Sequence, residues 1–277
     1  MSIRITSHKG FEFFTKQDFV DLYRYRDLLF MLVKREINVL YKQTVLGFAW
    51  AVIKPLAQMI VFTLVFGKLI NFQGLMENGM PYAVFSYAAL VPWTYFATAL
   101  TSASGSLIAN SSILTKVYFP RIIAPLTSVL AKLLDFCIAL VVLVGLLLFY
   151  NIEPSINLLY LPLLVLLMIT TAFGMSIWLA ALSIAYRDVQ QLMTFLVQLL
   201  MFAAPVIWPV SLIPTEYRFW VGFYPMSGII EGFRVCLTGI GVMPWDMLLP
   251  STISTVAIFV TGALYFKNKE HKLSDVI

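Results

Sequence analysis

Two charged side chains inside one apolar run are the clearest candidates for chemistry in this sequence. Lys132 and Asp135 stand three residues apart between residues 122 and 150, so a helix would place them on one face. Charges inside a bilayer are costly and commonly functional, although a single carboxylate offers little material for a proton relay. The two charges could equally neutralise each other as a structural pair near the cytoplasmic leaflet. The sequence leaves both interpretations open.

The chain has no arrangement of residues typical of a catalytic or metal centre. Cys137 and Cys236 are far apart, and His8 and His271 lie near opposite ends without ligand spacing. The apolar runs hold neither paired carboxylates nor a Ser/His/Asp set, so we expect no catalytic residue and no metal site. The net charge of +5 is spread over loops beside apolar runs, which favours membrane topology over nucleic-acid binding.

These residues belong to a chain that is too apolar for a soluble globule. Of the 277 residues, 60% are hydrophobic and only 12% are charged, whereas a soluble domain usually has about 25% charged residues. We therefore expect an all-α polytopic membrane protein with a single domain over residues 1–277. Apolar runs of about 20 residues predict six transmembrane helices within residues 48–266, near 48–70, 82–108, 122–150, 158–185, 192–210 and 248–266.

A basic amphipathic helix is predicted before the first span, over residues 17–45. We expect it to lie in the plane of the membrane surface, held by apolar burial and by anionic headgroups. The alternative is a soluble amphipathic helix packed on a partner. Its apolar face consists of Phe30, Val33, Ile37, Leu40 and Tyr41, and its positive charges are Arg24, Arg26, Lys34, Arg35 and Lys42.

The distribution of positive charge predicts the orientation of the spans. Of the 19 Lys and Arg residues, 14 fall on the side of the amino terminus and 3 on the opposite side. Loops rich in Lys and Arg stay in the cytoplasm. We therefore expect both termini to be cytoplasmic.

Residues 211–242, between the fifth and sixth spans, are predicted to form an extracytoplasmic re-entrant segment of two short helices. Glu231 and Arg234 are costly at a bilayer centre, and several glycines interrupt the run, which argues against a seventh span. Such a turn must be buried in protein or face a water-filled cavity. We expect Tyr224, Pro225, Glu231 and Arg234 to form a gate at the outer mouth of a pathway. The alternative is a plain extracytoplasmic loop.

Small residues also recur at helical spacing. Ala172, Ser176 and Ala180 form a stripe in the fourth span, and Gly228 and Gly232 repeat the pattern later in the chain. Such stripes allow two helices to pack closely. The contact can lie between two chains or within one.

Four runs resemble ABC-2 type permeases, and more narrowly those that export O-antigen and related polysaccharides or polyol phosphates. In order along the chain, the runs are YRYRDLLFMLVKREINVLYKQTVLGFAWAVIKPL, LTKVYFPRIIAPL, YRDVQQLMTFLVQLLMFAAPVIWPVSLIP and YPMSGIIEGFR. The sequence departs from the family at two positions. The family often has Asn-Pro where this chain has Tyr224-Pro225, and often a Trp where this chain has Val235.

The resemblance implies an ABC-2 fold of the type V exporter kind and an assembly with a separate motor. Two copies of this chain would pair with two copies of a cytoplasmic ABC ATPase, which would bind ATP and Mg. The assembly would export a lipid-linked polysaccharide across the bacterial inner membrane. This chain lacks the G-x-x-x-x-G-K-[ST] phosphate loop, so we expect a transporter subunit that is not an enzyme and holds no cofactor.

Other functions remain open at this stage. An ion-coupled secondary transporter and a membrane-embedded lipid-modifying enzyme come from different classes. Within the same family, the substrate could instead be a teichoic acid, a capsule polymer or a drug.

The resemblance also assigns residues to ATPase coupling. The loop between the second and third spans would form a short helix that docks in a cleft of the ATPase, and the alternative is an interfacial turn with no partner. Arg187 and Asp188 would assist, unless Arg187 is a cytoplasmic anchor and Asp188 a helix cap. The predicted coupling residues of the loop are Asn110, Ser111, Ile113, Leu114, Lys116, Val117, Tyr118 and Phe119.

A lipid-linked polysaccharide would require a basic headgroup site and a path lined by aromatic rings. Arg35, Lys42 and Lys54 are the nearest basic candidates for a pyrophosphate headgroup, although each could simply anchor the chain at the surface. Sugar rings stack on aromatic side chains, whereas in most membrane proteins such side chains serve packing or interface belts. The predicted channel-lining aromatics are Phe62, Phe66, Trp93, Tyr95, Phe202 and Trp208.

Overall fold

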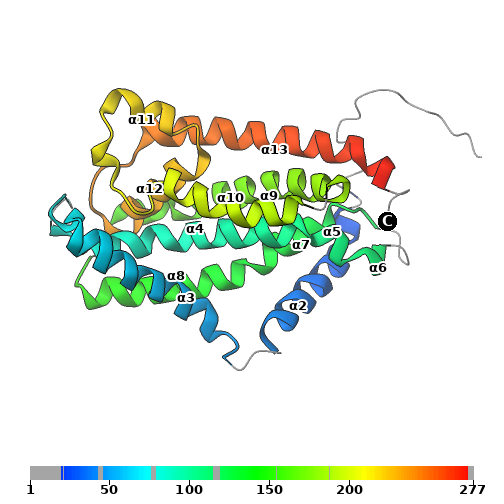
Figure 1. The fold of residues 1–277 in the computed structure, drawn as a ribbon, viewed down its shortest axis with the longest axis horizontal. Helices are drawn as coiled ribbons and strands as arrows, with labels where there is room; N and C mark the ends of the chain where they lie inside the picture. Colours follow the sequence, from blue (N-terminus) through cyan, green and yellow to red (C-terminus); the bar gives the residue numbers. More distant parts are fainter. Residues whose placement is uncertain are drawn as a thin grey trace, which may run out of the picture.

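The computed structural model describes residues 20, 22–42, 46–75, 79–114, 119–153, 155–186 and 188–273, and the side chains of all of these except 114 and 270–273. Helices and connecting turns make up these residues, and none of the described residues lies in a strand. The helices run mainly along one long axis (Figure 1). The predicted all-α fold is confirmed for this part of the chain.

The central element is helix α4, Tyr82–Ser104, which is buried along most of its length. A helix that is apolar on every side is stable only when neighbours surround it. Six helices pack around α4: α3 (Ala49–Phe62), α7 (Ile123–Ala131), α8 (Leu133–Phe149), α9 (Leu161–Ala185), α10 (Val189–Ala203) and α12 (Pro225–Thr238).

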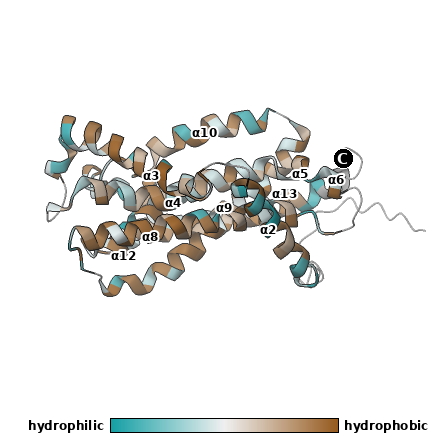
Figure 2. Ribbon diagram, turned by 90° about the horizontal axis from the view of Figure 1, so that it is seen from below, coloured by the Kyte–Doolittle hydropathy of each residue, from teal (hydrophilic) through white to brown (hydrophobic). Residues whose placement is uncertain are grey.

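The remaining elements cap the bundle and flank it. Figure 1 places α11 at one end of the long axis and α5 and α6 at the other. Figure 2 shows hydrophobic residues along the long helices, with hydrophilic residues mainly toward the two ends and on α2. These elements are α2 (Arg26–Lys42), η1 (Thr63–Leu69), η2 (Phe72–Leu75), α5 (Ser106–Ala109), α6 (Ser111–Leu114), η4 (Ile156–Tyr160), η5 (Val210–Leu212), α11 (Thr215–Val221) and α13 (Trp245–Leu273).

Helices α9 and α13 pack unusually closely because glycines face each other at the crossing. A Cβ added to Gly174 would lie 2.8 Å from the Cα of Phe259, and one added to Gly262 would lie 2.6 Å from the Gly174 carbonyl oxygen. The hydroxyls of Thr171 and Thr255 share a hydrogen bond of 2.8 Å across the same interface. Close contact of this kind is the usual reason for small residues in membrane helices.

The two predicted small-residue stripes are both buried within the chain. Ala172, Ser176 and Ala180 are fully covered by neighbouring helices. A Cβ at Gly228 would lie 2.8 Å from the Met247 carbonyl oxygen, so this glycine presses α12 against α13. Of the two possibilities left open by the sequence, intrachain packing is the one observed.

Among the described residues, five helical segments are long and apolar enough to cross a membrane, where the sequence predicts six. They are 49–69, 82–104, 123–149, 156–185 and 245–269. The predicted fifth span, 192–210, begins instead as the 15-residue α10, which ends at Ala203. Ala204 is extended, with ψ 151°, because a residue before proline disfavours the α-helical region and Pro205 follows.

The chain from α10 onward nevertheless runs beside α4 over its whole length. At one end, Gln190 Nε2 lies 3.0 Å from the position of a Cβ on Gly105, just after α4. At the other end, the Tyr82 hydroxyl donates to the Ile207 carbonyl at 2.7 Å. A short helix and the turns that follow it together thus cover the distance of a full span.

Helices α11 and α12 form a hairpin against the first turns of α13. A Cβ at Gly222, between the two helices, would lie 2.5 Å from Pro250 Cγ. Tyr224, just before α12, donates its hydroxyl to the Leu200 carbonyl of α10 at 3.4 Å. At the far end of α12, Gly239 adopts φ +67°, and a Cβ there would lie 2.9 Å from Ser155 Cβ. The hairpin therefore reaches from the level of α10 to the start of η4.

Helix α2 packs on α7 through a face that the sequence does not predict. Leu32 is buried with Phe119 and Ile123, whereas Phe30 and Leu40 of the predicted apolar face are exposed, Phe30 to 76%. Apolar residues lie around most of this helix, so periodicity alone could not select the packing face. One apolar face meets protein and a second stays uncovered in the single chain.

Candidate functional site

A cavity of about 380 Å³ lies between α3, α4 and α8, beside the carboxyl end of α2. Figure 1 shows α2 and α3 diverging from their junction next to this region. The lining combines two lysines and one carboxylate with hydroxyls and rings. The polar lining residues are Lys54, Thr94, Thr98, Lys132 and Asp135, and the aromatic ones are Tyr41, Trp50, Tyr95 and Phe136.

Lys132 is the most unusual of these side chains. It is 7% exposed, yet none of the hydrogen bonds or ion pairs found among the described residues involves its ammonium group. Asp135 Oδ1 is also buried without a hydrogen-bond partner. No ion pair joins Lys132 and Asp135, so the predicted structural pair is not formed. Lys132 lies between α7 and α8 with helical dihedrals, φ −73° and ψ −13°, and its carbonyl accepts from the Phe136 amide at 3.1 Å.

Glu36 of α2 contacts the helical turn that precedes Lys132. The Ser128 hydroxyl donates to Glu36 Oε2 at 3.3 Å. Burial raises the pKa of Glu36 above its usual 4.5, and the Ser128 hydrogen bond and the attraction of Lys132 partly oppose that shift. Sequence reasoning missed Glu36. Its spacing of four from the buried Leu32 was the available signal.

The loop between α4 and α7 is joined to α2 by a polar contact. Arg35 Nη2 donates to Asn110 Oδ1 at 2.8 Å, and Asn110 Nδ2 donates to the Ser106 carbonyl at 2.8 Å. Phe119 is 5% exposed and packs with Leu32, so it connects the loop to α2 and presents no free surface. Among the predicted coupling residues, Asn110 and Phe119 thus contact α2.

The other predicted coupling residues are placed only in part. Ser111 opens the short helix α6, and Ile113 is partly buried beside the α2–α7 contact. Asp188 is exposed and makes no side-chain cap bond at the start of α10. Lys116, Val117, Tyr118 and Arg187 lie outside the described residues, as does the side chain of Leu114.

The three predicted headgroup residues do not form one site. Arg35 is hydrogen-bonded to Asn110. Lys42 lies on the exposed surface of α2 beside Lys34 and Asn38. Lys54 alone lines the cavity, with its Nζ 5.7 Å from the centroid of the Trp50 ring.

The predicted channel aromatics separate into core and surface positions. Phe62, Trp93 and Tyr95 are core residues of the single chain, each at most 8% exposed. Tyr95 also lines the cavity. Phe66 and Trp208 are partly buried, and Phe202 is 57% exposed on α10. Only the last three face outward enough to line a path between chains.

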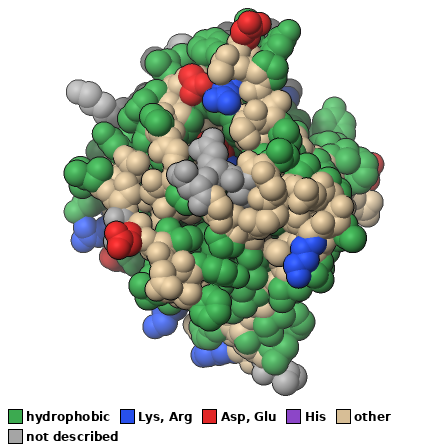
Figure 3. All heavy atoms as spheres, turned by 90° about the vertical axis from the view of Figure 1, so that its left-hand side faces the viewer, with side chains coloured by type: hydrophobic (Ala, Val, Ile, Leu, Met, Phe, Trp, Pro, Cys, Tyr) green, Lys and Arg blue, Asp and Glu red, His purple; other side chains and the backbone are tan. Residues whose placement is uncertain are grey.

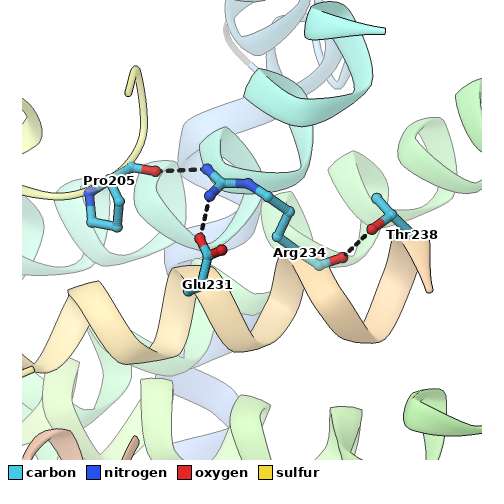
Figure 4. A network of polar contacts seen from close by, with 4 residues as sticks. All are labelled: Pro205, Glu231, Arg234 and Thr238. Carbon is cyan, nitrogen blue, oxygen red and sulfur yellow. Dashed lines mark hydrogen bonds and ion pairs between the residues drawn. The ribbon is translucent and has the colours of Figure 1, made fainter. Parts of the chain in front are cut away.

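At the other end of the bundle, Arg234 of α12 is the centre of a buried polar network (Figure 4). Its guanidinium forms an ion pair with Glu231, and Nη2 donates to the Pro205 carbonyl at 2.6 Å. The guanidinium carbon lies 3.6 Å from the centroid of the Phe85 ring on α4. Arg234 is only 3% exposed. One side chain therefore joins α12, α4 and the segment after α10.

This network supplies hydrogen bonds where α10 stops. A helix end in an apolar environment leaves carbonyls that need donors. Leu200, Phe202, Pro205 and Ile207 accept from the side chains of Tyr224, Trp208, Arg234 and Tyr82 respectively. The broken helix is thus capped by side chains from α4, from the loop before α12, from α12 and from its own continuation.

A pocket of about 430 Å³ opens beside the network. Figure 3 views this end of the bundle and shows acidic and basic side chains close together near a hollow. Arg218, Glu231, Arg234 and Asp246 contribute the charges of the lining. The predicted gate residues Glu231 and Arg234 are therefore together here, while Tyr224 and Pro225 lie at the opposite end of α12.

Residues 27–238 match the family described as ABC-2 type transporter. The chain belongs to this family. The match runs from α2 to the end of α12, so the cavity and the Arg234 network lie mainly within it. The resemblance noted in the four sequence runs is confirmed.

Curated relatives of this ABC-2 transporter chain are similar over most of its length. It is 25% identical over 252 residues to the O-antigen export system permease protein RfbA of Klebsiella pneumoniae, and the aligned region covers 91% of this chain and 95% of the relative. It is 26% identical over 259 residues to RfbA of Myxococcus xanthus, covering 93% and 98%. It is 24% identical over 258 residues to the polysialic acid transport protein KpsM of Escherichia coli, covering 88% and 94%.

Proposed function

We propose that this chain is the permease subunit of an ATP-driven exporter that moves a lipid-linked polysaccharide across the bacterial inner membrane. The observation that carries the proposal is the similarity, over about nine-tenths of the chain, to proteins named for O-antigen export and polysialic acid transport. ATP and Mg would bind to a separate ABC ATPase, of which two copies would join two copies of this chain.

In this proposal the chain crosses the membrane six times, with both termini in the cytoplasm. The fifth crossing is α10 followed by residues 204–209, which together run the length of α4. Helices α11 and α12 enter from the outer face and return, and the Arg234 network keeps their junction with α10 hydrogen-bonded. Helix α2 lies at the cytoplasmic surface, where its uncovered apolar side chains meet lipid.

Two copies would meet through the face formed by α3 and α10. Gln58 of α3 donates to the Met201 sulfur of α10 at 3.2 Å, so the two helices form one continuous surface. Side chains along α10 leave an apolar stripe uncovered in the single chain. A path for the polymer would run along this face. The stripe consists of Leu192, Phe195, Leu199 and Phe202.

ATPase movement would reach the bundle through the loop 110–121 and α2. The Arg35–Asn110 hydrogen bond makes the two elements move together. The contact of Leu32 with Phe119 and Ile123 then transmits that movement to α7. Headgroup binding at the cytoplasmic end would prepare the substrate for transfer.

Deleting this chain tests the function directly. We expect finished polymer to accumulate inside the cell and to vanish from the surface, and the same result when the ATPase is inactivated. Surface polymer that is unchanged in a strain without a duplicate exporter would contradict the proposal. Transport that follows a proton gradient without an ATPase, and is lost in Asp135→Asn, would identify a secondary transporter. Turnover of a lipid by the purified chain would identify an enzyme.

A further inference from the structure

Lys132 is a mostly buried side chain whose ammonium group has no counter-charge at contact distance among the described residues. It is 7% exposed, it lines the cavity between α3, α4 and α8, and no hydrogen bond or ion pair with another described residue satisfies it. A charge withdrawn from water is costly unless it is paired. Lys54 lines the same cavity and repels Lys132. Because the two positive charges repel each other, the cavity should bind an anion that contacts both lysines.

The rest of the lining narrows the chemistry of that anion. Thr94 and Thr98 bring hydroxyls to the cavity wall, and Trp50 and Tyr95 bring rings. Lys54, Lys132 and Asp135 together carry a net positive charge, so the site suits a multiply charged oxyanion attached to an apolar or sugar-bearing group. Lys54 and Trp50 are both partly open, which places the entrance on the α3 side.

We propose that this cavity binds a phosphate-bearing headgroup through Lys132 and Lys54, and that the bound phosphate competes with Glu36 of α2 for Lys132. The inference rests on the proposed function in taking the headgroup to belong to the transported lipid. Glu36 accepts a hydrogen bond from Ser128 of α7, one helical turn before Lys132, so the two opposite charges lie close enough to attract each other. A phosphate at Lys132 weakens that attraction and loosens α2 from α7. Binding in the cavity thereby changes the packing of α2, the helix that contacts the loop 110–121.

Binding is tested on the purified full chain in phosphatidylcholine nanodiscs, with farnesyl pyrophosphate as the probe. We expect Lys132→Gln to weaken binding by about tenfold or more and Lys54→Gln to weaken it by less. Lys34→Gln, a matched change on the exposed surface of α2, should leave it unchanged. Equal affinity in Lys132→Gln and the unaltered chain would overturn the proposal.

Two further arms identify the source of the phosphate. Inorganic pyrophosphate that displaces the probe at similar concentration shows that the phosphate alone is recognised. Phosphatidylglycerol nanodiscs that abolish probe binding show that a bulk lipid headgroup occupies the cavity. If neither inorganic pyrophosphate nor phosphatidylglycerol reduces the binding of farnesyl pyrophosphate, the site is selective for an isoprenoid-linked pyrophosphate. Each result supports the phosphate site and names its ligand.

The competition with Glu36 is tested by labelling a cysteine at the buried Leu32 with maleimide, in a Cys137→Ser background because Cys137 is exposed. We expect the probe to speed labelling of Leu32→Cys several-fold, and to have no effect when Lys132→Gln is added. Glu36→Gln should bind the probe more tightly and label quickly without it. A cysteine at Leu166, an exposed residue of α9, is the reference, and its labelling rate should not change when the probe is added. Labelling that is insensitive to the probe would overturn the competition.

These measurements are independent of export. They use neither the ATPase nor polymer, so a phosphate site stands even if deletion leaves surface polymer unchanged. Conversely, a strain that loses export on deletion while Lys132→Gln binds the probe normally would overturn this inference alone.

Discussion

Arg234 shows how a single side chain can support a break in a helix that is surrounded by apolar residues. Its guanidinium meets the Glu231 carboxylate, the Pro205 carbonyl and the face of the Phe85 ring. Removing one partner of a buried ion pair leaves the other charge uncompensated, which is costlier than removing both. The network should therefore respond very differently to single and double substitution.

We predict that Arg234→Met lowers stability by about 3–5 kcal/mol, because it leaves Glu231 without its partner and the Pro205 carbonyl without a donor. Adding Glu231→Gln should restore part of that loss, since the buried charge is then gone. The measurement is the unfolding midpoint in detergent. Arg218→Met, an arginine near the same pocket, is the control and should change the midpoint little. A double variant no more stable than Arg234→Met would contradict this account.

Some residues of the buried polar networks could be predicted from the sequence, and their partners could not. Glu231 and Arg234 stand out in the sequence because charge is rare in an apolar run. Their partners Pro205 and Phe85 do not, because the chain brings them together only on folding. The spacing of Lys132 and Asp135 suggested an ion pair, which the structure does not contain. Spacing along a helix does not determine which group a long, flexible lysine side chain meets.

At the scale of elements, helices α9 and α13 make a close contact at a crossing of glycines. Gly174 has the Phe259 backbone where its Cβ would be, whereas Gly145 of α8 has nothing within 4 Å. Both glycines lie inside long helices. Comparing alanine substitutions at these two glycines therefore separates the effect of steric crowding from that of helix propensity.

We predict that Gly174→Ala destabilises the chain by about 1–3 kcal/mol, because the added methyl forces α13 away from α9. Gly145→Ala should be neutral or should stabilise by up to about 1 kcal/mol, the usual gain of alanine over glycine in a helix. Thermal unfolding of the two variants, measured side by side in the same detergent, checks the difference. Equal midpoints would mean that α9 and α13 separate at no cost.

Element boundaries were predictable to different extents. Five long apolar helices coincide with predicted spans because about 20 apolar residues suffice to define them. The run 192–210 has the same composition but is helical only to Ala203. Its Ala204-Pro205 step was visible in the sequence, yet counting apolar residues ignores the backbone restriction imposed by proline.

The uncovered apolar face of α3 and α10 is a property of the whole molecule. In the single chain Phe202 and Leu199 are at least 50% exposed on α10, next to the Gln58–Met201 contact with α3. Lipid tails can cover such a face, as can a second copy of the chain. The proposed two-fold assembly requires the second copy.

We predict that cysteines at Leu199 or Phe202, in a Cys137→Ser background, cross-link two chains in membranes under mild oxidation. A symmetric interface brings the same residue of both copies together near its axis. Leu166→Cys on α9 is similarly exposed and should remain monomeric on a denaturing, non-reducing gel. Monomer at all three positions would place the dimer contact elsewhere.

The sequence by itself determined the all-helical membrane class, the five long apolar helices and the family, because each depends on composition or on local runs of residues. The tertiary structure alone decided which face of α2 packs, where α10 breaks, and which partners the buried charges meet. Those features arise from contacts between residues far apart in the chain, such as Glu36 with Ser128 and Arg234 with Pro205. Neither periodicity nor spacing contains that information, because the neighbours of a side chain are set by the packing of whole helices.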